Sequence, residues 1–119
     1  MINKNLITDV YSTNEVKTNK VFKGKPVYRK IIEISNINNT TGDNFISTGI
    51  TDLETCVSLD GIFNVGVNRI PINFHNSISG NGSYSFCCFY HYTNKQIDIL
   101  CKTAINSGHV IIEYTKTTD

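Results

Sequence analysis

The sequence has no tryptophan, a single methionine and two prolines among its 119 residues, and only 18% of the residues are charged. Eleven lysines and arginines nearly balance ten aspartates and glutamates, which leaves a formal net charge of +1 at pH 7. So small a net charge provides no electrostatic field over the whole molecule that could attract a polyanion. We therefore expect no nucleic-acid partner, although a local basic patch is compatible with this balance.

Long apolar segments are missing as well. No stretch approaches the roughly 20 apolar residues that cross a membrane as a helix, and residues 1–16 lack the apolar core of a signal peptide. We expect a protein with no membrane partner that is made in a cytoplasm and is not secreted by a signal peptide. Helical periodicity is nearly absent too, and the capping-box spacing of Ser12 and Glu15 predicts at most one helical turn.

The residue types that carry catalysis or bind metals show no pattern typical of either. The cysteines lack the paired C-x2-C spacing of zinc sites, and the histidines lack the spacing of metal ligands. These residues are Cys56, Cys87, Cys88, Cys101, His75, His91 and His109. No nucleophile elbow or phosphate-binding loop occurs, and nothing in the sequence selects a catalytic pair among the acidic residues. We predict free thiols, no metal, no cofactor and no enzymatic activity.

What the sequence does contain is a series of short apolar segments separated by glycine, asparagine and aspartate, which is typical of β-strands joined by turns. The predicted strands cover residues 27–34, 45–50, 53–59, 62–67, 69–74, 84–92, 96–102 and 110–116. Turns are expected at residues 24–26, 60–61, 93–95 and 106–109, and long polar loops at 36–44 and 75–83.

This spacing predicts an all-β fold, an antiparallel β-sandwich or jelly-roll-like barrel of about seven or eight strands. We expect a single domain over residues 11–119, preceded by a short N-terminal extension at 1–10. In the strand at 27–34, alternation places Tyr28, Ile32 and Ile34 on the core face and Arg29 on the other. Pro71 cannot donate to a ladder, so its strand should lie at an edge or contain a bulge.

Two features are candidates for binding. The first is a basic ribbon at residues 17–30, which contains more than half of the basic residues and no acidic residue. Its candidate anion contacts are Lys20, Lys23, Lys25 and Arg29. The alternative is that these lysines protect the edge of a hairpin against sheet-to-sheet aggregation.

The second feature is the aromatic cluster at residues 84–92, because sugar rings stack on aromatic faces that have amides nearby. Alternation places Tyr84, Phe86, Cys88, Tyr90 and Tyr92 on one face, most of which should be core or subunit interface. The candidate ligand-binding residues are Tyr90, Tyr92, Asn94, His91, Asn76 and Asn81.

Both ends of the chain resemble one family. The stretch YSTNEVKTNKVFKGKPVYRKIIEI (11–34) is similar to a pattern of Tyr-Ser-Thr-x-Glu followed by an aromatic residue, Gly-Lys-Pro and Tyr. The chain ends in IEYTKTTD (112–119), which resembles the terminal Ile-x-Tyr-Thr-Lys-Thr-Thr-Asp of the same family. Together these motifs resemble the C-terminal domain of phage tail-fibre and receptor-binding proteins. The chain departs from the pattern at Phe22-Lys23, where the family commonly has Trp followed by Ile-Asp.

The resemblance implies a homotrimeric β-sandwich whose tip binds carbohydrate on a bacterial surface. The leading hypothesis is a host-attachment module of a phage or prophage tail, with a surface glycan or teichoic wall polymer as ligand. Its partners would be that polymer, further copies of itself and other tail proteins, and it would reside at the virion tail tip after synthesis in the host cytoplasm. The alternative is a structural tail or baseplate protein that makes only protein contacts. Polar loops 36–44 and 75–83 would contribute ligand contacts.

Overall fold

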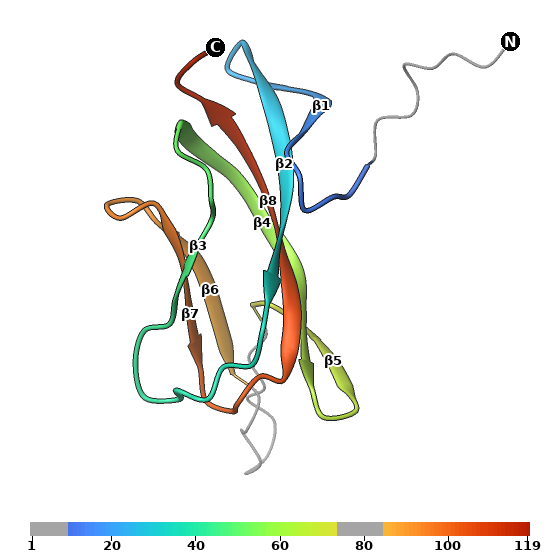
Figure 1. Ribbon diagram of the computed structural model, residues 1–119, viewed down its shortest axis with the longest axis vertical. Helices are drawn as coiled ribbons and strands as arrows, with labels where there is room; N and C mark the ends of the chain where they lie inside the picture. The colour runs from blue at the N-terminus through green and yellow to red at the C-terminus, as the bar shows by residue number, and fades with distance from the viewer. Residues whose placement is uncertain (1–9, 74–84) are drawn as a thin grey trace, which may run out of the picture.

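The protein is all-β, as expected from its sequence. The computed structural model in Figure 1 describes residues 10–73 and 85–119, and no helix occurs in these two ranges. The strands are β1 (Val16–Phe22), β2 (Lys25–Ile34), β3 (Phe45–Ser47), β4 (Leu53–Val65), β5 (Asn68–Pro71), β6 (Phe86–His91), β7 (Gln96–Cys101) and β8 (Ser107–Lys116). A helix long and apolar enough to cross a membrane is therefore not found in the described part of the chain.

The strands form two antiparallel sheets that pack face to face as a β-sandwich. The larger sheet has the order β1-β2-β8-β4-β5 and the smaller one β3-β7-β6 (Figure 1). Residues of the central strands point into the space between the sheets, and the fully buried ones include Phe63, Phe86, Ile97, Ile99 and Ile112. The rings of Phe63 and Phe86 meet edge to face at 5.5 Å and join the two layers. The two-sheet prediction is confirmed.

The basic ribbon forms the predicted hairpin, but its turn lies one residue earlier than expected. Phe22 pairs with Lys25, so the turn consists of Lys23 and Gly24, and Lys25 and Pro26 already belong to β2. Both turn residues have positive φ, 50° and 81°, which suits a two-residue turn whose twist matches the flanking strands. The core face of β2 is as predicted, with Ile32 and Ile34 buried and Tyr28 half-buried.

Two predicted turns are wrong because glycine has another role there. Residues 60–61 lie inside β4, where Gly61 has φ +145° and pairs with Val110 of β8. A Cβ atom on Gly61 would lie 2.2 Å from the carbonyl oxygen of His109, so only glycine allows this close approach. The turn expected at 106–109 is likewise mostly strand, since β8 begins at Ser107. Its Gly108 packs against the backbone of β4, and a Cβ atom there would lie 2.5 Å from the Ile62 carbonyl oxygen.

The edges of the larger sheet behave as the sequence predicts. Pro71 lies in β5, an edge strand of only four residues. At the opposite edge, the register of β1 shifts between Lys17 and Val21, which marks an irregular strand. Short, irregular or proline-containing edges discourage pairing with another sheet. The basic ribbon therefore has a structural role at the sheet edge.

Candidate functional site

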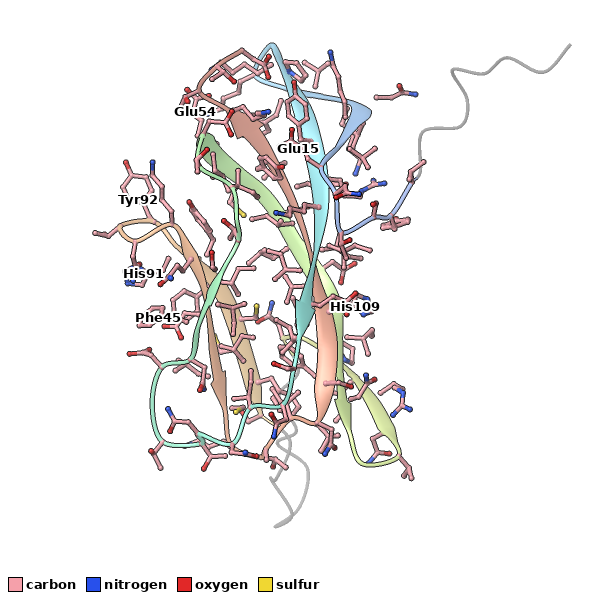
Figure 2. All side chains as sticks on the ribbon, in the orientation of Figure 1. Glu15, Phe45, Glu54, His91, Tyr92 and His109 are labelled. Carbon is pink, nitrogen blue, oxygen red and sulfur yellow. The ribbon has the colours of Figure 1, made fainter. Side chains whose placement is uncertain are left out.

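The residue before β1 and the end of β8 meet at one end of the sandwich, in a cluster that we call the terminal clasp (Glu15, Tyr28, Asp52, Tyr114 and Lys116). Figure 2 labels Glu15 at this end of the molecule. The Glu15 carboxylate accepts hydrogen bonds from the Tyr114 hydroxyl and, at 2.8 Å, from the Lys116 ammonium group. That ammonium group lies 3.5 Å from Asp52 and 4.7 Å from the centre of the Tyr28 ring. Burial and the bond to Glu15 raise the pKa of Tyr114, so its hydroxyl stays protonated and donates. The clasp fixes the chain ends.

Beside the clasp lies a pocket of about 500 Å³, which we call the hairpin groove (Leu53, Glu54, Tyr92, Thr93, Lys95 and Thr117). It is formed by the start of β4, the β6–β7 loop and the segment after β8. Glu54 is held in place by Lys25, whose ammonium group donates to its carboxylate at 2.7 Å, and by the Thr115 hydroxyl at 3.4 Å. The Lys25 hydrogen bond lowers the pKa of Glu54 and keeps the carboxylate ionised.

The β6–β7 loop presents an aromatic side chain to this groove. His91 pairs with Gln96, which leaves residues 92–95 as a four-residue loop, closed by a hydrogen bond from the Lys95 N–H to the His91 carbonyl oxygen (2.8 Å). Tyr92 is 82% exposed, and Figure 2 shows it at the same end of the molecule as Glu54. An exposed tyrosine ring above a groove lined by hydroxyls and a carboxylate provides both stacking and hydrogen-bonding groups for a polyhydroxylated ligand.

The structure brings together only some of the predicted ligand-binding residues. Tyr92 lines the groove, and Asn94 is exposed in the same loop. His91 instead points to the outer face of the smaller sheet, where its ring meets that of Phe45 edge to face at 5.4 Å (Figure 2). Tyr90 is half-buried against the core, and burial raises its pKa. Asn76 and Asn81, like Tyr84 and the predicted loop 75–83, lie outside the described residues.

Most of the candidate anion contacts pair with acidic groups of the protein itself. Lys25 binds Glu54, Lys20 lies 2.9 Å from Glu113, and the Arg29 guanidinium group lies 2.7 Å from the same carboxylate. Lys23 is exposed in the hairpin turn, with its ammonium group 5.4 Å from the ring centre of Phe22. These internal ion pairs favour the structural interpretation of the ribbon.

The Arg29–Glu113 pair lies at the floor of a second pocket, about 300 Å³, on the outer face of the larger sheet. The Arg29 side chain is only 4% exposed and that of Glu113 8%, which the alternation of β2 did not predict. Tyr11 covers the pair, with its ring centre 4.5 Å from Cζ of Arg29. Burial by itself would raise the pKa of Glu113, but hydrogen bonds from Lys20 and Arg29 outweigh it and lower the pKa.

The outer face of the smaller sheet carries two exposed phenylalanines. Phe45 and Phe89 are 43% and 37% exposed and pair on either side of Asp98, which is only 2% exposed. The Asp98 carboxylate accepts a hydrogen bond from the Asn44 N–H at 3.1 Å, while burial and the neighbouring Asp43 raise its pKa. An apolar strip of this kind is suited to protein contact.

Sequence patterns did not identify Glu54, Lys95 or Thr117 as groove residues, because they come from three distant segments. The one available signal was the loop TNK (93–95), which the sequence predicts as a hairpin connection next to aromatic residues. The four cysteines are free. No group of three or more histidine, cysteine, aspartate or glutamate side chains that could hold a metal ion occurs in residues 10–73 and 85–119.

Comparison with known proteins identified no relative of this chain. A scan against protein-family models matches no family, and searches of curated proteins and of solved structures find no match.

Proposed function

We propose that this chain is the receptor-binding module of a phage or prophage tail fibre and attaches to a carbohydrate or teichoic polymer on the bacterial surface. Support for the context comes from the resemblance of residues 11–34 and 112–119 to tail-fibre C-terminal domains. The observation that carries the binding role is the exposure of Tyr92 on the rim of the hairpin groove.

The groove offers the groups that recognise a sugar. The Tyr92 ring can stack on the C–H face of a pyranose, while the Thr93 and Thr117 hydroxyls and the Glu54 carboxylate can bond to its hydroxyls. A groove open to solvent gives weak single-site binding, on the order of 4 kcal/mol at a millimolar dissociation constant. A homotrimer at the virion tail tip would raise the avidity of such sites by orders of magnitude without new contacts.

A pull-down of the protein on purified bacterial cell walls and a glycan array tests this proposal. Replacing Tyr92 by alanine should weaken binding by about fivefold at each site, since stacking contributes on the order of 1 kcal/mol, and by more where several sites act together. The control variant is Tyr11→Ala, which removes an exposed tyrosine that lies over Arg29 and does not line the groove. Failure of the folded wild-type protein to bind any wall or glycan refutes the receptor-binding role.

A second candidate function is that of a structural tail or baseplate protein, favoured by the exposed Phe45 and Phe89 on the smaller sheet. This function predicts that Phe89→Ser abolishes association with other tail proteins and that the wild-type protein binds no glycan. Mass determination by light scattering tests the proposed homotrimer, and a monomer at micromolar concentration would contradict it.

A further inference from the structure

The hairpin groove contains one basic side chain, and that side chain has no acidic partner. Lys95 lines the groove and is exposed, and no carboxylate in residues 10–73 or 85–119 forms an ion pair with it. Two nearby lysines are neutralised: Lys25 by Glu54 and Lys116 by Glu15 and Asp52. The groove therefore keeps the positive charge of Lys95 available to a ligand.

The backbone of Lys95 is unfavourable for a lysine. Its φ is +55°, in the left-handed region that glycine or asparagine adopts more readily than lysine does. Holding a residue with an ordinary side chain there costs on the order of 1 kcal/mol. The hydrogen bond that closes the loop uses the backbone N–H of Lys95 and not its side chain. Loop closure thus does not use the lysine side chain, which stays available to a ligand.

The remaining groove residues indicate which other groups a negatively charged ligand should carry. The Tyr92 ring is 82% exposed, the threonine hydroxyls line the same space, and Leu53, 2% exposed, forms the apolar floor. The Glu54 carboxylate is already neutralised by Lys25 at 2.7 Å, so it can accept hydroxyl hydrogen bonds without repelling an anion strongly. Stacking surface, hydroxyl partners and an unpaired ammonium group together match an acidic sugar.

We propose that the hairpin groove binds a saccharide that carries an anionic group, with that group placed on the Lys95 ammonium and a sugar face on Tyr92. The inference rests on the proposed function and names the ligand class of the same site. The anionic group is a phosphate ester or a carboxylate, both of which offer oxygen acceptors to an ammonium donor. Under this proposal, the anionic group contacts Lys95 and not the basic ribbon of β1 and β2.

The chain provides a matched control for the test. Lys23 is also exposed and also has a left-handed φ, +50°, but it lies in the β1–β2 turn and does not line the groove. Lys95→Asn and Lys23→Asn therefore remove the same charge from the same backbone conformation, and asparagine tolerates that conformation. Neither variant should lower the melting temperature.

The binding assay uses immobilised phosphorylated dextran and dextran, and polygalacturonate and its methyl ester. Each pair shares one backbone and differs in charge, and the two pairs distinguish phosphate from carboxylate. The wild-type protein and Lys23→Asn should bind an acidic polymer at least about tenfold more tightly than its neutral form at 50 mM salt, with the difference reduced at high salt. Lys95→Asn should lose this preference.

The outcomes distinguish failure of the anionic-ligand inference from failure of the receptor-binding function. Binding to the neutral polymers that equals binding to the acidic ones, or equal losses in the two asparagine variants, overturns the inference and leaves glycan binding intact. Absence of binding to every polymer here and to every wall in the pull-down overturns the receptor-binding function and the inference with it. A preference for acidic polymer that Lys95→Asn alone removes supports both.

Discussion

The buried pair of Arg29 and Glu113 leads to the most demanding prediction about stability. The two residues face each other across β2 and β8, and the carboxylate also accepts hydrogen bonds from Lys20 at 2.9 Å and from the Ser58 hydroxyl at 3.3 Å. Replacing Glu113 by leucine leaves the Arg29 guanidinium group, 4% exposed, without its carboxylate. Breaking a buried pair from one side costs about 3–5 kcal/mol of unfolding free energy.

The reverse change should cost less, because Glu113 keeps two of its donors. Arg29→Met retains most of the packing of the long side chain and should lower the unfolding free energy by about 2 kcal/mol, the contribution of hydrogen bonds to a charged group. The double variant, with methionine and leucine side by side, should come within about 1 kcal/mol of the wild type, since apolar pairs often replace buried ion pairs without loss. Lys20→Met, at a side chain 59% exposed, should cost less than about 1 kcal/mol.

Urea unfolding followed by circular dichroism measures all four variants. Because Arg29 and Glu113 are coupled, the double variant should be more stable than Glu113→Leu alone by at least about 2 kcal/mol of unfolding free energy, or about 8 °C in melting temperature. Because the folded pKa of Glu113 is lowered, its contribution to stability should be present above its unfolded pKa and be lost as the pH falls through the folded pKa. Costs below about 1 kcal/mol for both Glu113→Leu and Arg29→Met would refute the reasoning, because they would mean that the pair is hydrated.

Two further predictions concern a glycine and a carboxyl group. Gly61→Ala should lower the unfolding free energy by about 3 kcal/mol or more, because its Cβ atom would meet the His109 carbonyl. Gly66→Ala, at φ +58° with open space around it, should cost about 1 kcal/mol in the same urea experiment. Equal costs of the two variants would contradict the close-approach explanation. The raised pKa of Asp98 means that its protonated form favours folding, so the contribution of Asp98 to stability should be fully present below the ordinary carboxyl pKa and decline as the pH rises through the raised value. Asp98→Asn, which resembles the protonated form, should remove this decline in melting curves recorded from pH 3 to 8, and an unchanged pH profile would rule out Asp98 as its source.

The fold class could be predicted because alternation is a local property of the sequence. The segments around Ile32, Ile97 and Ile112 each bury alternate apolar residues, as the period of 2 requires, while Ile31, Leu100 and Ile111 lie on the outer faces. The turns were less predictable, since glycine both permits a turn and permits two backbones to approach. At Gly61 and Gly108 the second reason applies, and only the position of the partner strand distinguishes it from the first.

The groove and the clasp could not be predicted, because their members are brought together by sheet order alone. Lys25 and Glu54 are 29 residues apart, and Glu15 and Lys116 are 101 apart, so neither pair produces a pattern in any short window. The Tyr-Ser-Thr-x-Glu and Tyr-Thr-Lys-Thr-Thr-Asp motifs nevertheless meet in space, where Glu15 binds Tyr114 and Lys116. The two motifs therefore supply a set of contacts that hold the beginning of β1 against the end of β8.

The placement of the lysines shows why charge density along a sequence is a weak indicator of anion binding. The ribbon contains more than half of the basic residues, but Lys20, Lys25 and Arg29 each bind a carboxylate on another strand. A lysine whose charge is already compensated gains less from an external anion, since binding must compete with the internal pair. Lys95 is isolated in the sequence and unpaired in the described structure, and it lines a groove with an exposed aromatic ring. Charge compensation, which depends on the fold, therefore ranks Lys95 above Lys20, Lys25 and Arg29 as the group that meets an anionic ligand, and its place in the groove distinguishes Lys95 from Lys23, which is exposed in the hairpin turn.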